Sequence, residues 1–91
     1  MKSEAEGFIG FRPNTREELF AMELAMRLSD TKSLALYISF AKKYDEATLR
    51  RFLGVVMEIP ANKIKKSRGA LFNYLIQKYA EETETKDNPR D

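Results

Sequence analysis

The chain has 91 residues, of which 43% are hydrophobic and 33% are charged, and it contains no cysteine and no histidine. These values are typical of one globular domain rather than of a disordered or fibrous chain. The two missing residue types exclude disulfides, thiolate or imidazole metal ligands, and catalysis by cysteine or histidine. No apolar run approaches the roughly 18 residues that span a bilayer. Because the N-terminus is acidic and unlike a signal peptide, we expect a cytoplasmic protein without membrane contact.

The net charge of +2 is distributed unevenly along the chain. Residues 1–45 carry seven basic and seven acidic side chains. Residues 46–80 carry seven basic side chains against two acidic ones, whereas residues 81–91 carry two basic side chains against five acidic ones. A basic second half indicates that an anionic partner is one class of function to consider.

The N-terminal arm, residues 1–13, contains two glycines and a proline, which predict a segment without regular structure. Its apolar side chains are Phe8, Ile9 and Phe11. A small domain needs most of its apolar residues for its core. We therefore expect the arm to fold back over the first helix.

The first two helices are marked by residues that cap helix ends. Thr15, followed three residues later by Glu18, is a capping box and predicts a helix over residues 16–28. Ser29, Asp30 and Thr31 then interrupt the apolar pattern. These residues supply the N-cap of a second helix, expected over residues 32–43.

The third helix is expected over residues 46–58, with Asp45 as its N-cap. Pro60 ends it, because the residue before a proline is disfavoured in the α conformation. Gly54 lies in the middle of this helix, where glycine costs about 1 kcal/mol relative to alanine. Close approach of a neighbouring helix is the expected reason for it.

The fourth helix has two possible starts and is expected to end near Glu82. Either Ser67 is its N-cap and the residues before it form a turn, or one long helix begins at Pro60. We favour the first alternative, with a short helical turn over residues 60–64. Residues 83–91 are mostly polar and acidic and predict a frayed, disordered tail.

The connections between these helices are short, so consecutive helices should be neighbours in space. The predicted fold is therefore all-α: a single small bundle of about four helices over residues 14–82. The irregular arm precedes this domain, and the acidic tail follows it.

The clearest functional signal lies between Lys63 and Arg68, where four of six residues are basic. Each cation at a helix N-terminus is unfavourable by about 0.3–1 kcal/mol, so an anion could relieve the conflict. We interpret the cluster as a site for nucleic-acid phosphates, and six contacts predict a slope of log K against log salt of about −5. The candidate contacts are Lys63, Lys65, Lys66 and Arg68, with Arg50 and Arg51 in support.

Three alternatives stay open. The basic run can be a solvated loop without a ligand. A helix-turn-helix formed by the second and third helices is disfavoured, because the third helix begins with Glu46 rather than with cations. The chain can also be a protein-interaction or homo-oligomerisation module, because the first two helices carry more apolar residues than one buried face needs. Its candidate contacts are Leu36, Phe40, Met22 and Met26.

No catalytic residue, metal site or cofactor is expected. Most acidic residues of the predicted domain fall at helix starts, and the four glycines do not have the spacing of a phosphate-binding loop. The sequence therefore predicts a non-enzymatic module, with nucleic acid as the first choice of partner and a protein or a second copy as the alternative.

Overall fold

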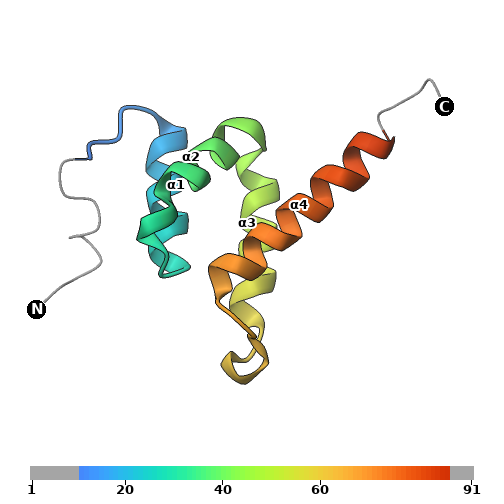
Figure 1. The fold of residues 1–91 in the computed structure, drawn as a ribbon. Helices are drawn as coiled ribbons and strands as arrows, with labels where there is room; N and C mark the ends of the chain where they lie inside the picture. Colours follow the sequence, from blue (N-terminus) through green and yellow to red (C-terminus); the bar gives the residue numbers. More distant parts are fainter. Residues whose placement is uncertain (1–10, 87–91) are drawn as a thin grey trace, which may run out of the picture.

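The computed structural model describes residues 11–86, with side chains described as far as Thr83. Over these residues the fold is all-α, as the sequence predicts. The elements are α1 (Arg16–Arg27), the 3-10 helix η2 (Thr31–Ser33), α2 (Leu34–Lys43), α3 (Glu46–Glu58), the 3-10 helix η3 (Ala61–Lys63) and α4 (Arg68–Lys86). Figure 1 shows α1 and α2 on one side of α3, while α4 runs back across α3 and extends beyond it.

The start of α1 confirms the predicted cap. The side-chain oxygen of Thr15 accepts a hydrogen bond from the Glu18 N–H at 3.0 Å. The Glu18 carboxylate in turn accepts one from the Asn14 N–H at 2.8 Å. The carboxylate thus reaches one residue further back than in the usual capping box, and it still satisfies a free donor before the helix.

A Schellman motif ends α1. Ser29 has a left-handed backbone with φ of 53°. Its N–H donates to the Met26 carbonyl at 3.1 Å, and the Asp30 N–H donates to the Ala25 carbonyl at 2.8 Å. These two bonds satisfy carbonyls left free at the helix end.

Asp45 occupies the predicted N-cap position of α3, and Asp30 occupies that of η2, but among the described residues neither side chain makes a capping hydrogen bond. The Asp30 carboxylate accepts a hydrogen bond from the Tyr37 hydroxyl instead, at 2.8 Å. Burial and this carboxylate raise the pKa of Tyr37 above its ordinary value. The phenol therefore remains a donor at neutral pH, and it ties the α1–α2 connection to the core.

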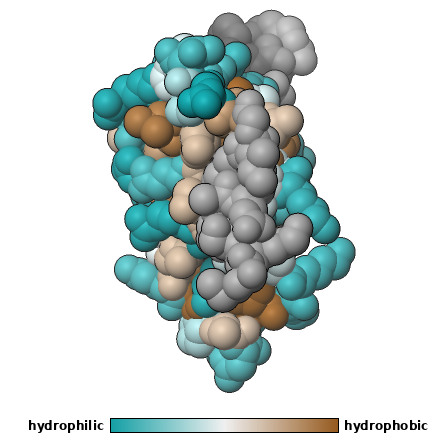
Figure 2. Space-filling view, turned by 90° about the vertical axis from the view of Figure 1, so that its left-hand side faces the viewer, coloured by the Kyte–Doolittle hydropathy of each residue, from teal (hydrophilic) through white to brown (hydrophobic). Residues whose placement is uncertain are grey.

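All four described α-helices contribute to the hydrophobic core. The rings of Tyr37, Phe40 and Phe72 pack at centroid distances of 6.1–6.3 Å. Phe11 is half-buried against this core, as expected for an arm that folds back, whereas Phe8 and Ile9 lie outside the described residues. Figure 2 looks onto the α1–α2 side, where separate hydrophobic patches interrupt a largely hydrophilic surface.

The C-terminal helix is longer than predicted. α4 reaches Lys86, whereas the sequence predicts an end near Glu82. Glutamate and lysine favour helix, and the first proline after α4 is Pro89. The rest of the predicted tail, residues 87–91, lies outside the described residues.

Gly54 and Gly69 differ in how closely neighbouring residues approach them. A Cβ at Gly69, in the first turn of α4, would lie 2.7 Å from Asp30 Oδ2 and 2.8 Å from the Tyr37 hydroxyl oxygen. A Cβ at Gly54 would have no described atom within 4 Å, so the predicted helix contact there is wrong. The position that needs glycine is therefore the start of α4, where it packs on the α1–α2 connection.

Replacing each glycine by alanine should change stability in opposite directions. Gly54→Ala should raise the free energy of unfolding by about 1 kcal/mol, because alanine is the better helix former and meets no neighbour. Gly69→Ala should lower it by about 1–3 kcal/mol, because the new methyl group must displace the hydrogen-bonded Tyr37 and Asp30. Urea unfolding of both variants measures the two changes, and equal effects would contradict this packing.

Candidate functional site

The α3–α4 elbow, residues 59–67, carries the predicted basic run. A single 3-10 turn, η3, follows Pro60, and α4 begins only at Arg68. The Ser67 side-chain oxygen accepts a hydrogen bond from the Ala70 N–H at 3.0 Å. This contact confirms Ser67 as the N-cap and excludes the long unbroken helix, so the lysines before Ser67 lie in a connection.

Arg68 caps the end of α3. Its Nη1 atom donates to the carbonyl oxygens of Val56 at 2.6 Å and Ile59 at 2.9 Å. These carbonyls lie at the negative end of the α3 dipole. The Arg68 guanidinium at the start of α4 is therefore stabilised by carbonyl groups of the protein itself. The unfavourable interaction of this cation with the N-terminus of α4, inferred from the sequence, needs no external anion.

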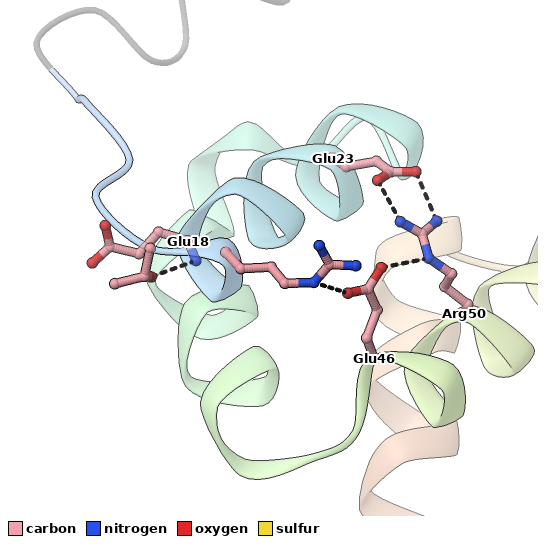
Figure 3. Close-up of polar contacts among 6 residues, drawn as sticks. Glu18, Glu23, Glu46 and Arg50 are labelled. Atoms are coloured by element: carbon pink, nitrogen blue, oxygen red, sulfur yellow. Dashed lines mark hydrogen bonds and ion pairs between the residues drawn. The ribbon is translucent and has the colours of Figure 1, made fainter.

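Arg50 joins α3 to α1 (Figure 3). Its guanidinium donates two hydrogen bonds to Glu23, at 2.9 and 3.0 Å, and a third to Glu46 at 2.8 Å. Glu46 also accepts a hydrogen bond from Arg16 at 3.1 Å. The hydrogen bonds from Arg50 hold the pKa of both carboxyl groups below the ordinary value. The guanidinium carbon lies 4.6 Å from the centroid of the Phe20 ring, which adds a cation–π contact.

Arg50 and Arg51 lie away from the elbow. They precede Glu58, the last residue of α3, by seven or eight residues, which corresponds to about 10–12 Å along the helix axis. Arg51 is exposed, with its guanidinium 5.4 Å from the centroid of the Phe52 ring. The elbow and the two arginines of α3 therefore do not form one compact cluster.

Three exposed lysines remain at the elbow: Lys63, Lys65 and Lys66, here called the elbow lysines. Among the described side chains, none of them forms an ion pair. They border a groove of about 470 Å³. The other residues that line it are Ile64, Ser67, Ala70, Leu71 and Tyr74. The groove thus combines uncompensated positive charge with a largely apolar lining.

Tyr74 is a lining residue that the sequence analysis misses. It is 58% exposed and lies on α4 outside the buried positions of that helix. The sequence could reveal Tyr74 through its spacing. It lies two residues after Phe72 and two before Ile76, and those two residues are buried on one face of α4, so Tyr74 lies on another face. An aromatic side chain there is exposed to solvent unless a partner covers it.

The predicted partner-binding residues separate into buried and exposed groups. Phe40 is 5% exposed and packs in the core. Leu36 is 37% exposed on α2, and Met26 is 40% exposed on α1. A second groove, the α1 groove, lies on the surface of α1 and has a volume of about 330 Å³. It is lined by Leu19, Met22, Glu23, Met26 and Arg27.

Comparisons with models of protein families, with curated proteins and with solved structures found no match to this chain. Among the helices in the described part of the chain, none has the length and apolar character needed to cross a bilayer. The function is therefore inferred from the geometry of the elbow groove and the α1 groove.

Proposed function

We propose that this chain is a small, non-enzymatic cytoplasmic module that binds nucleic acid through the phosphate backbone, with the elbow lysines as its contacts. The observation that carries the proposal is that three exposed lysines line one groove without a described carboxylate partner. Backbone phosphates are a regular array of anions, and binding them releases condensed counterions.

The internal contacts of the elbow favour binding. Arg68 and the Ser67 cap fix the course of the chain on the C-terminal side of the lysines. A ligand then has less backbone to order when it binds, which lowers the entropic cost of association. Arg50 and Arg68 stay outside the proposed contact set, because intramolecular acceptors already bind their guanidinium groups. Arg51 is also left out, because it lies on α3 away from the elbow. The proposal therefore uses three cations rather than six.

Binding should weaken with salt as expected for three phosphate contacts. The elbow lysines alone should give a slope of log K against log salt of about −3 on duplex DNA and about −2 on a single strand. Lys65→Ala combined with Lys66→Ala should make the slope shallower by about 2 on duplex DNA, because two contacts are lost. Anisotropy titrations of labelled mixed-sequence oligonucleotides at several salt concentrations measure both values.

The matched control is Lys42→Ala combined with Lys43→Ala, which removes the same charge from the C-terminal end of α2. It should leave the slope nearly unchanged. The proposal fails if the protein binds neither form of DNA at low salt, if affinity does not depend on salt, or if the control weakens binding as much as the elbow variant.

Self-association through α1 is a second candidate function. The α1 seam, formed by Leu19, Met22 and Met26, has the i, i+3, i+7 spacing of residues at a helix–helix contact. Leu19 is 60% exposed and Met26 is 40% exposed, although the opposite side of α1 is buried in the core. This second apolar face is the specific observation that favours a protein partner.

If the α1 seam pairs two copies, the solution mass should rise above the chain mass of 10.5 kDa as concentration increases. Leu19→Glu should abolish the rise, because pairing would bury the new carboxylate without a partner. Sedimentation or light scattering measures the mass. A monomer at every concentration would contradict this candidate and would leave the nucleic-acid proposal unaffected.

A further inference from the structure

Among the described residues, Tyr74 packs against no other aromatic ring. It is 58% exposed, whereas every other aromatic side chain in the described part of the chain is buried or half-buried. Most of those other rings pack against one another, as Tyr44 and Phe52 do against Tyr79. Among the described residues, the Tyr74 ring makes no aromatic, cation–π or hydrogen-bond contact. More than half of the Tyr74 surface is therefore open to a ligand.

Positive charge flanks this ring along the direction of α4. The elbow lysines lie at the N-terminal end of the groove that Tyr74 lines. Lys78 is exposed and lies four residues after Tyr74, on the same face of α4. Acidic residues follow at Glu81 and Glu82, so the basic stretch ends there. An aromatic ring between cations is the arrangement that proteins use for single-stranded nucleic acid.

We propose that the elbow groove takes single-stranded nucleic acid, with one base stacked on the Tyr74 ring and the flanking phosphates near the elbow lysines and Lys78. This inference rests on the proposed function and adds the class of nucleic acid. Inside a duplex both faces of a base are covered by neighbouring bases. Only an unpaired base can therefore lay its face on the ring, while phosphate contacts alone do not distinguish the two forms.

The test compares two single strands that carry equal charge. One is a mixed-sequence DNA strand, and the other is an abasic strand with the same number of phosphates. The wild-type chain should bind the normal strand about 10-fold more tightly, because one base–aromatic stack contributes an effect of this order. Anisotropy titrations or competition at fixed salt concentration measure the ratio of the two dissociation constants.

Substitutions at Tyr74 identify the ring as the cause of the preference. Tyr74→Leu keeps apolar bulk but lacks an aromatic face, so it should bind the two strands about equally. Tyr74→Phe keeps the face and should retain the preference. The side chain is largely exposed, so both variants should fold, and circular dichroism together with unchanged binding to the abasic strand checks this.

The outcomes separate this inference from the proposed function. Equal binding of both strands by the wild-type chain overturns base stacking and leaves phosphate binding intact. A preference that survives in Tyr74→Leu overturns the role of Tyr74 in the same way. Absence of binding to either single strand overturns the inference, and the proposed function falls with it only if duplex DNA is not bound either.

Discussion

The hydrogen bonds from Arg68 to the end of α3 are the constraint on which the functional part of this molecule depends. One guanidinium nitrogen contacts two terminal carbonyls, those of Val56 and Ile59. The positive residue that begins α4 thereby stabilises the negative end of the preceding helix. On its other side, α4 packs through Gly69 onto the hydrogen-bonded pair of Asp30 and Tyr37. The start of α4 is thus fixed from two directions.

This arrangement divides the cations into two groups. The guanidinium groups of Arg50 and Arg68 hold helices together, because each donates to acceptors on another element. The elbow lysines make no ion pair among the described side chains. Arginine suits the first task, since its planar group forms several fixed hydrogen bonds, whereas lysine suits a solvated contact with phosphate. The function proposed for this chain follows from the second group.

Local signals predict most of the fold, and tertiary contacts explain the differences. Caps at Thr15 and Ser67 and the break at Pro60 depend on nearby residues, so the sequence is sufficient to place them. The sequence does not reveal that Gly69 is the glycine at a close contact, because the contact is with Asp30, a residue 39 positions away. The partners of Arg50 and the exposure of Tyr74 likewise arise from helix packing. Charge density along the chain therefore predicts a candidate segment, but not which of its cations lack a partner among the described side chains.

The division of the cations into structural arginines and solvated lysines is tested most directly by comparing the urea unfolding of Arg68→Ala with that of Lys66→Ala. Each variant removes one positive charge from neighbouring positions. Arg68→Ala should lower the free energy of unfolding by about 2 kcal/mol, because two charge-assisted hydrogen bonds are lost. Lys66→Ala should change it by less than about 0.5 kcal/mol. If Arg68→Ala unfolds at the same urea concentration as Lys66→Ala, the assignment of Arg68 to the fold, and the elbow built on it, is contradicted.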